Sequence, residues 1–445
     1  MQTTSLFPGT DVVVATGDGV TVNDNSFAAP RLRRPDRQQT TLEPCCLDER
    51  LPADHPVRTI WKVVESLDLS AFYTPIAARG SDPGRAATDP KLLVALWLYA
   101  AVDGVGNGRE LDRLCRERDA YRWLCGGVSM NYHTLNDFRV GHAQGLDDLF
   151  TKVLASLMHH DVVKVNRISQ DGTRVPASAG KSSFRRKARI EDFLTQAKAH
   201  VEGLKKQADE APEDSARQRS AHERAARERQ ERLEAALEEF VKIEAVKAKQ
   251  REDKPSKHRE PRVSTTDPDA RTMKMGNGGF NPAYNVQIAA DTESRAIVAI
   301  DVTNHGCDSG EDRGLREQVK RRTGQRPKEH LLDGGYLNRN GIEQASQEGV
   351  DLYVPLSPTG GKGQVCTEHK GDPPGVAAWR KRMTSEEGKA IYKLRASTSE
   401  TVNADLKTFR GLRAFAVRGL GKVRCVALWS ALAYNVMHFA TVLVT

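Results

Sequence analysis

The sequence predicts a mixed α/β protein that begins with a helical region and is interrupted by a charged helical insertion. Apolar residues recur at helical spacing from about 54 to 160, and β-branched runs typical of strands begin at 162. A highly charged tract at 185–255 separates the first of these runs from the others. Strands that alternate with helices in this way favour a sheet with helices packed on it.

Composition limits the class of protein. Hydrophobic residues make up 38% and charged residues 28% of the 445 residues, which excludes a wholly buried membrane protein, a collagen-like fibre and a disulfide-stapled miniprotein. The net charge of +8 indicates a polyanionic partner. The seven cysteines form no CxxC pair, so we expect reduced thiols in a cytoplasmic protein and no zinc finger.

The length favours two or three domains. Residues 1–45 lack helical periodicity and end near the basic cluster RLRRPDR, so we predict a disordered leader there. We place a helical domain at 46–160 and an α/β domain at 161–445, with the insertion at 185–255 inside the α/β domain. In the helical domain, TDPKLLVALWLYAAVDG offers Asp89 as a capping residue and Pro90 in the first turn of a helix.

The α/β domain begins with VVKVNRIS at 162–169, an alternating run that predicts a strand. AYNVQIAAD and RAIVAIDVTN, separated by TES, predict a hairpin, and EHLL and GVDLYVPLS predict further strands. Helical periodicity resumes from about 385 to the end. The apolar spacing of the insertion predicts two helices broken near Pro212, which form either a solvated hairpin or a coil that binds a partner.

The C-terminal segment allows two interpretations. From Cys425 onward the chain has no Asp, Glu, Lys or Arg and is long enough for a membrane anchor. Ser430, Asn435 and His438 interrupt it, and Trp429 lies within it rather than at an end, which favours a buried helix.

Two aspartates follow strand-like runs. Asp171 comes after the first run and precedes Gly172, and Asp333 ends EHLLD and precedes two glycines. Carboxylates at the ends of neighbouring strands can converge, and small residues beside them leave space for a ligand. Hard divalent cations prefer such oxygen ligands, and two ions would support an in-line phosphoryl displacement. An Asp-Gly turn is the alternative for each, and Asp291 and Asp301 occupy similar positions.

A third acidic residue lies in the helical segment YKLRASTSETVNADLK. Glu400 and Lys407 are seven residues apart and share one helix face, while Tyr392 and Arg395 are three apart and share another. A carboxylate beside these cations suits a metal ligand next to a phosphate clamp. An amphipathic surface helix with ordinary ion pairs is the alternative.

The helical domain contains a basic segment, GRELDRLCRERDAYRWLCGG, followed by a turn and NYHTLNDFRVGH. This order is compatible with a helix-turn-helix. Candidate groove-facing residues are His133, Thr134, Asn136 and Arg139. Candidate phosphate contacts are Arg109, Arg113, Arg116 and Arg118. The alternative is a helical bundle whose surface charges pair with one another.

Several of these segments together resemble bacterial insertion-sequence transposases of the DDE class. The resemblance is carried by DGTRVPASAGKSSFRR, STTDPDARTMKMGNGGFNPAYNVQ, DGGY and YKLRASTSETVNADLK, and it extends to GNGRELDRLCRERDAYRWLCGGVSMNYHTLNDFR. It covers nearly everything from about residue 45 to the C-terminus. It implies an RNase H-like mixed sheet with flanking helices.

The resemblance also implies a site. Two aspartates and a glutamate would bind two Mg²⁺ ions, which Mn²⁺ can replace, and they correspond to Asp171, Asp333 and Glu400. Tyr392, Arg395, Glu400 and Lys407 resemble the Y-R-E-K signature, in which the tyrosine and the two basic residues contact DNA.

The signature departs from its usual spacing, because four residues rather than three separate Arg395 from Glu400. On a continuous helix the extra residue rotates Arg395 by about 100°. Either the helix begins between these residues or Arg395 is not the equivalent residue. Glu386 and Glu387 are rival third carboxylates, but we favour Glu400.

The expected function is therefore that of a DNA transposase that binds the ends of its element and catalyses metal-dependent cleavage and strand transfer. Its partners would be double-stranded DNA, both element ends and target, and a second copy of the chain in the DNA complex. We expect it in the cytoplasm, associated with the nucleoid and not with a membrane. The alternatives are a metal-dependent nuclease without strand transfer and an inactive copy that only binds DNA.

Overall fold

The computed structural model describes residues 46–77, 86–210, 216–253, 260–356 and 371–444. The leader predicted at 1–45 and the break predicted near Pro212 lie outside these residues. Residues 46–445 form one compact unit, so the helical and α/β domains predicted on either side of residue 160 both fall within it.

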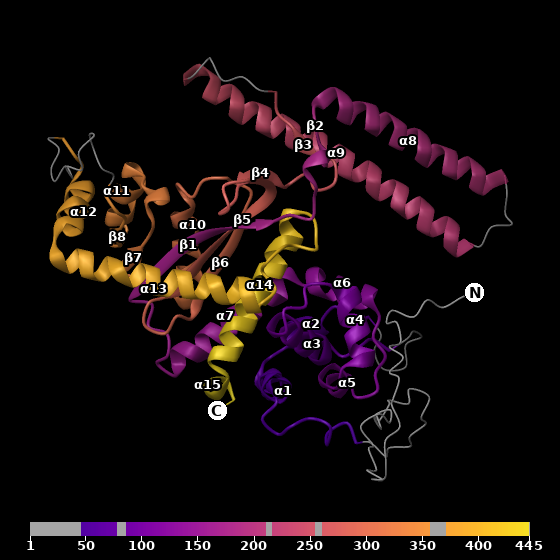
Figure 1. Cartoon of the computed structure of the whole chain (residues 1–445), viewed down its shortest axis with the longest axis horizontal. Coiled ribbons are helices and arrows are strands. Elements are labelled where there is room, and N and C mark those ends of the chain that lie inside the picture. Colours follow the sequence, from indigo (N-terminus) through magenta and orange to yellow (C-terminus); the bar gives the residue numbers. More distant parts are fainter. Residues whose placement is uncertain (1–45, 78–85, 211–215, 254–259, 357–370, 445) are drawn as a thin grey trace, which may run out of the picture. The chain divides into compact units, whose positions relative to one another are not determined.

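The N-terminal part is helical, as predicted (Figure 1). Asp89 accepts a hydrogen bond from the Lys91 N–H and caps the central helix, and Pro90 is its first residue. This helix is buried on nearly every side, which explains why its sequence has no polar face. The seven helices are α1 (Pro56–Ser66), α2 (Ser70–Tyr73), α3 (Pro90–Val102), α4 (Gly108–Glu117), α5 (Asp119–Cys125), α6 (Tyr132–Gly141) and α7 (Ala143–His159).

A mixed sheet follows, in the order β4-β5-β1-β7-β8, with β6 also paired to β5. The central strand β1 is antiparallel to β5 and parallel to β7, β6 is antiparallel to β5, and β8 is parallel to β7. The strands are β1 (Arg167–Pro176), β4 (Arg271–Lys274), β5 (Phe280–Asp291), β6 (Ile297–Thr303), β7 (Glu329–Leu331) and β8 (Asp351–Tyr353). This mixed sheet, preceded by helices and interrupted by an insertion, confirms the predicted fold class.

One boundary differs from the prediction in a way that affects the site. The strand expected at 162–169 is β1, which runs from Arg167 to Pro176 and therefore contains Asp171. An Asp-Gly pair usually favours a turn, but here β5 pairs with β1 along its length, with Asp171 opposite Ile288 and Gly172 opposite Gln287. The pairing holds the chain extended, so Asp171 lies within the strand and not after it.

Helices cover the sheet and connect its strands. Helix α10 (Glu311–Thr323) joins β6 to β7, and α11 (Arg339–Gln347) joins β7 to β8. Helix α12 (Pro374–Thr384) leads into α13 (Glu386–Phe409), which crosses the sheet against β1 and β5 (Figure 1). A short 3-10 turn, η3 (Gly334–Tyr336), follows β7.

The charged insertion forms two helices that pack side by side, α8 (Lys187–Glu210) and α9 (Ala216–Asp253) (Figure 1). Their contact is a small apolar cluster of their own, which contains Ile190, Leu233 and Phe240. A two-stranded ladder closes the base of the hairpin, where β2 (Phe184–Arg185) pairs with β3 (Val263–Ser264).

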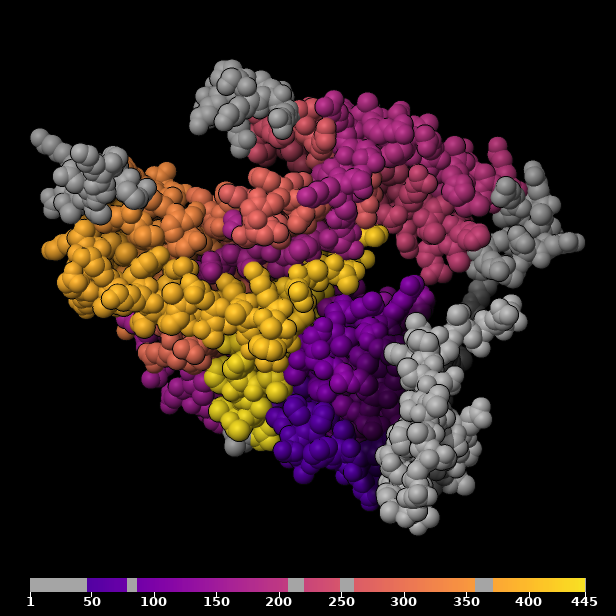
Figure 2. Space-filling view, in the orientation of Figure 1, coloured from indigo at the N-terminus to yellow at the C-terminus, as the bar shows by residue number. Residues whose placement is uncertain are grey.

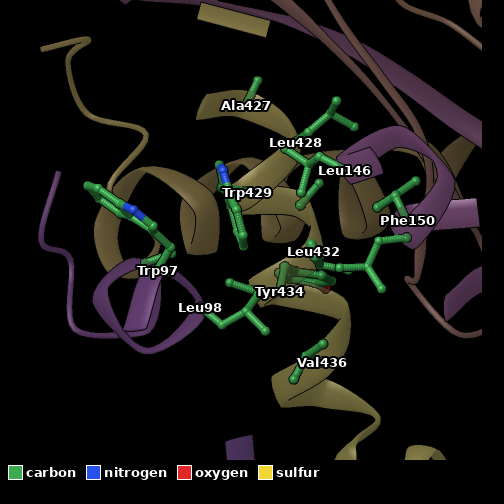
Figure 3. Packing of buried hydrophobic residues seen from close by; sticks show 14 of the residues in the cluster. Trp97, Leu98, Leu146, Phe150, Ala427, Leu428, Trp429, Leu432, Tyr434 and Val436 are labelled. Carbon is green, nitrogen blue, oxygen red and sulfur yellow. The ribbon is translucent and has the colours of Figure 1, made fainter. Parts of the chain in front are cut away.

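The C-terminal helix α14 (Leu420–His438) lies in the core, as favoured by its sequence, and packs against α3, α7 and β6. Figure 3 shows its apolar side chains meeting those of α3 and α7. Its polar residues are satisfied internally: Asn435 bonds to both backbone groups of Ile297, and Ser430 donates to the Arg410 carbonyl. None of the described helices has the length and apolarity to cross a membrane. The last helix is α15 (Ala440–Leu443).

Candidate active site

Asp171 lies on β1 beneath helix α13. Its Oδ1 accepts a hydrogen bond from the Gly172 N–H (2.9 Å), and its Oδ2 accepts one from Asn403 Nδ2 (3.1 Å). Arg395 Nη1 is 3.9 Å from the same Oδ2. Two residues earlier, Ser169 bonds to Ser399 through their hydroxyl groups (2.6 Å), which fixes the helix on this face of the strand.

The surroundings of Asp171 disfavour its charge. Burial raises the pKa of this carboxyl to about 6, and the negative charges of Asp333 and Asp308 also raise it, while Arg395 opposes them. An acid that is pushed toward neutrality by burial and by other acids is typical of a functional site.

Asp333 follows β7 and begins the 3-10 turn. Its Oδ1 accepts a hydrogen bond from the Gly335 N–H (2.8 Å). A Cβ on Gly335 would lie only 3.0 Å from that oxygen, so a larger residue there would have to push the carboxylate aside. Because β7 pairs with β1 up to Ser169, Asp333 emerges beside Asp171, and its charge acts on that carboxyl. The structure therefore brings the two predicted aspartates together.

Three residues of the signature lie near enough to Asp171 to interact with its charge. Burial raises the pKa of Tyr392, and the charges of Asp333 and Asp171 add to this effect. Burial lowers the pKa of Lys407, and the charge of Asp171 opposes the shift. With Arg395, the signature thus brings one phenol and two cations within electrostatic reach of Asp171.

Glu400 is placed differently. Helix α13 is continuous from Glu386 to Phe409, so it does not begin between Arg395 and Glu400, and Arg395 nevertheless faces Asp171. Five residues on, Glu400 is rotated by roughly 140° from Arg395 and shares its face with Lys407. Its side chain is exposed and has no ion-pair partner among the described residues. The outer side of α13 forms part of the surface in Figure 2.

A further acid at this place, Asp308, was not predicted from the sequence. It precedes α10, is 7% exposed, and accepts hydrogen bonds from Asn285 Nδ2 (2.7 Å), Gln287 Nε2 (2.8 Å) and Arg174 Nη2 (2.9 Å). We call Asp171, Asp333 and Asp308 the acidic centre. The one available signal was that Asp308 follows a predicted strand, a property that it shares with other aspartates of this sequence.

Those other aspartates have structural roles. Asp291 accepts hydrogen bonds from the Glu293 N–H, the Ser294 N–H and the Ser294 hydroxyl, and so holds the turn between β5 and β6. Asp301 pairs with Arg424 at 2.8 Å. Neither is part of the acidic centre.

Two family comparisons agree with this geometry. Residues 45–140 match the family described as Transposase domain (DUF772), and residues 249–436 match the Transposase DDE domain. The chain belongs to the DDE transposases of insertion sequences. The mixed sheet is accordingly that of an RNase H-like DDE domain. No curated protein and no solved structure matches the chain.

The DDE match includes Asp333 and Glu400, whereas Asp171 lies before its first residue. Between Asp171 and the matched segment lies most of the insertion, α8 and α9. The place of Asp171 in the transposase site therefore depends on the contacts described above.

Two members of the acidic centre, Asp171 and Asp333, have the chemistry that a divalent cation needs. DDE transposases generally use a divalent metal. Asp171 and Asp333 supply carboxylate oxygens, and the side-chain oxygen of Asn403, whose nitrogen donates to Asp171, is buried without a hydrogen-bond partner. A cation here would offset both the burial and the repulsion that raise the pKa of Asp171. In the described part of the chain, no three acidic, histidine or cysteine side chains lie close enough together to hold an ion.

The helices of the predicted helix-turn-helix are α4, α5 and α6. Arg139 was predicted to face a DNA groove, but it is buried. Its guanidinium lies over the Trp97 ring at 4.4 Å and donates to the Gly106 carbonyl. Asn136 is half-buried and packs against Gly108, where a Cβ would clash with it. Thr134 takes part in the cap of α6 through its contact with Asn131. Only His133 of this set is exposed.

The arginines of α4 form ion pairs within the helical region. Arg113 pairs with Glu110 and Glu117, and Arg116 pairs with Asp112. Arg118 pairs with Asp103, and Arg109 lies over the Tyr132 ring at 5.0 Å. These contacts are those of the alternative interpretation, in which surface charges of a helical bundle pair with one another.

Proposed function

We propose that this transposase binds the ends of its element, cleaves the DNA there and transfers the freed strand to target DNA. The observation that carries the proposal is Asp171, a half-buried carboxyl next to Asp333 and beneath Arg395 of α13. Two acids with the basic side chains of Arg395 and Lys407 nearby suit a polyanionic substrate that must be brought to a metal.

Asp171, Asp333 and Glu400 would hold Mg²⁺, two ions in all, with Mn²⁺ as a substitute. The bound metal would activate water and stabilise the oxygens of an in-line displacement. Arg395 and Lys407 would bind phosphates, and Tyr392 would pack against the DNA end. Glu400, exposed on the face that it shares with Lys407, would complete the site from the solvent side.

The helical region would contribute to end recognition through its exposed surface, with His133 and Thr134 at the start of α6 as its contacts to DNA. The acting form would be a homodimer on double-stranded DNA, in the cytoplasm and in association with the nucleoid. Of the groove-facing residues predicted from the sequence, Arg139 is left out because it is buried, and Asn136 because it packs against Gly108.

The test uses the purified transposase, DNA that carries the element ends, and Mg²⁺ or Mn²⁺. Asp171→Asn, Asp333→Asn and Glu400→Gln should each lower the cleavage rate at least a thousand-fold and leave DNA binding within a few-fold of wild type. Glu386→Gln is the control, because Glu386 lies on the same helix and pairs with Lys389 on the surface. Full cleavage by the Asp171 or Asp333 variant would sink the assignment, and full cleavage by the Glu400 variant would remove that residue from the site.

The same assay separates the alternative functions. Pre-cut ends incubated with metal and target DNA should give joined products. Cleavage without joining would identify a nuclease, and DNA binding without either reaction would identify an inactive copy.

A further inference from the structure

Asp308 stands out among the buried acids because every group that it holds lies beside the proposed catalytic aspartates. It accepts three hydrogen bonds, from Asn285 and Gln287 on β5 and from Arg174 on β1. Its backbone precedes α10, so it reaches the strands from outside the sheet. A carboxylate with three donors is anchored firmly and is well placed to fix its neighbours.

Asp308 packs closely on two glycines of the site. A Cβ on Gly172 would overlap Asp308 Oδ1 and Gln287 Nε2 and would lie 3.0 Å from Asn285 Oδ1. A Cβ on Gly335 would lie 3.6 Å from Asp308 Oδ2. The carboxylate therefore packs directly on the residue after Asp171 and close to the turn that begins with Asp333. The space expected for a ligand at Gly172 is filled by Asp308.

The contacts extend behind both aspartates. Gln287, which donates to Asp308, accepts hydrogen bonds from Gln170 Nε2 (2.8 Å) and from the Tyr336 hydroxyl. Gln170 immediately precedes Asp171, and Tyr336 ends the turn that follows Asp333. All of these side chains are buried. One network thus joins the backbone next to Asp171 to the backbone next to Asp333, with Asp308 at its end.

The negative charge of Asp308 also holds the guanidinium of Arg174 in place. Arg174 bonds to Asp308 Oδ2 and to the Gly306 carbonyl (3.1 Å), and its charge acts on Lys407, so it lies close to the site. An asparagine at position 308 has one oxygen in place of two, so its amide N–H₂ would face either this guanidinium or the amide donors of Asn285 and Gln287. In the first orientation Arg174 would keep the Gly306 carbonyl but lose its carboxylate partner, and could compete with a metal ion for nearby carboxylates. In the second orientation the amide network would lose its acceptor.

We propose that Asp308 is a positioning residue for the metal-binding aspartates: it holds Arg174 and the buried amide network under Gly172, and so keeps Asp171 and Asp333 arranged to bind a divalent cation. This inference rests on the proposed function, because it assumes that Asp171 and Asp333 are metal ligands.

The test compares Mn²⁺ binding by the full chain and by three variants, followed by calorimetry or by the spin-resonance signal of free Mn²⁺. Asp308→Asn should weaken binding at least ten-fold. Gly172→Ala, which displaces Asp308 without removing any charge, should also weaken it at least ten-fold. Asp291→Asn is the matched control, since Asp291 is equally buried, also accepts three hydrogen bonds and lies away from the acidic centre.

A general loss of stability would affect Asp308→Asn and Asp291→Asn alike, so each melting temperature is measured beside the affinity. Wild-type affinity in a folded Asp308→Asn or Gly172→Ala variant would overturn the inference and leave the proposed function intact. Equal weakening by Asp291→Asn would also overturn it. If the wild-type chain itself binds no Mn²⁺, the metal site of the proposed function fails, and the role of Asp308 fails with it.

Discussion

The ionised carboxyl of Asp171 is less favourable in the folded protein than in the unfolded chain. Burial and the neighbouring acids raise the pKa of this carboxyl from 3.8 to about 6, although its side chain keeps 22% of its exposure. An acid with a higher pKa in the folded state than in the unfolded state binds more protons when folded. Its ionisation therefore lowers the free energy of unfolding as the pH rises from about 4 to 6. The residue that we propose for catalysis is a source of instability.

Asp171→Asn should therefore stabilise the metal-free protein while it abolishes cleavage. Relative to wild type, we expect a gain of about 1–2 kcal/mol at pH 7.5, after allowing for partial exposure, and almost none near pH 4. Urea unfolding in the presence of EDTA at the two pH values measures the difference. Asp291→Asn, for which no such gain is expected, serves as the control. Equal urea midpoints for Asp171→Asn and wild type at pH 7.5 would contradict this account.

Single residues also show what could be predicted from the sequence and what could not. Tyr392, Arg395 and Lys407 could be proposed from the sequence because one helix carries them, and helical spacing shows which of them share a face. Arg139 was misjudged because an arginine near the polar side of a short helix gives no sign that a tryptophan from another helix will cover it. Asp308 was missed because its three partners lie on two strands, β5 and the more distant β1, whose pairing the sequence alone does not give.

At the scale of elements, local signals located most helices and strands but not all of their ends. Asp89 and Pro90 gave the start of α3, since capping is a property of adjacent residues. The end of β1 was not predictable in the same way. Its extension through Asp171 depends on pairing with β5, which lies more than a hundred residues later, beyond the insertion. Long-range pairing outweighed the local preference for a turn.

The N-terminus of helix α14 also depends on long-range contacts, because its caps come from residues about 150 positions earlier in the sequence. Gly419 has a positive φ of 88° and no side chain to act as a cap. Its N–H donates instead to Asp267 Oδ1 (3.1 Å), and the next N–H, that of Leu420, donates to Asp269 Oδ2 (2.8 Å). Asp267 is fully buried and also accepts the Tyr284 hydroxyl. The DPDA segment thus anchors the core helix to the sheet.

Asp267→Ala should cost about 2–4 kcal/mol of unfolding free energy, because it leaves a helix N–H and a buried tyrosine hydroxyl without partners. Asp269→Ala removes one hydrogen bond at a half-buried position and should cost about 1 kcal/mol. Chemical denaturation of the two variants checks the order. Equal losses would show that the cap of α14 does not depend on the buried aspartate.

At the scale of the whole molecule, the main body and the α8–α9 hairpin differ in how much apolar packing stabilises them. One apolar core runs from Leu51 to Leu443 and contains side chains of the N-terminal helices, of β1, β5 and β6, and of α14. A second cluster joins β7 and β8 to α11 and α12. The helical region and the sheet are therefore expected to unfold together. In the described residues, the hairpin of α8 and α9 has a small apolar cluster of its own, and Glu239 of α9 forms an ion pair with Arg271 of β4.

The chain enters and leaves the hairpin at one place, since Arg185 pairs with Val263 in the β2–β3 ladder. Replacing residues 186–262 by Asn-Gly would close this ladder with a two-residue turn. The shortened protein should unfold in one transition, with a melting temperature within about 5 °C of wild type. It should also bind Mn²⁺ as wild type does, because no contact described for the acidic centre involves the hairpin. Arg271→Gln is the control, since it loses the ion pair to Glu239 and keeps the hairpin.

DNA affinity then decides between the two interpretations of the insertion. A solvated hairpin predicts that the shortened protein binds element ends within about three-fold of wild type, because a few exposed charges contribute little at physiological salt. We expect this result, since lysines, arginines, aspartates and glutamates alternate along the described parts of both helices and many pair with one another. A loss of a hundred-fold or more with unchanged melting would contradict it. The hairpin would then be a DNA-binding arm carried on a catalytic domain that folds without it.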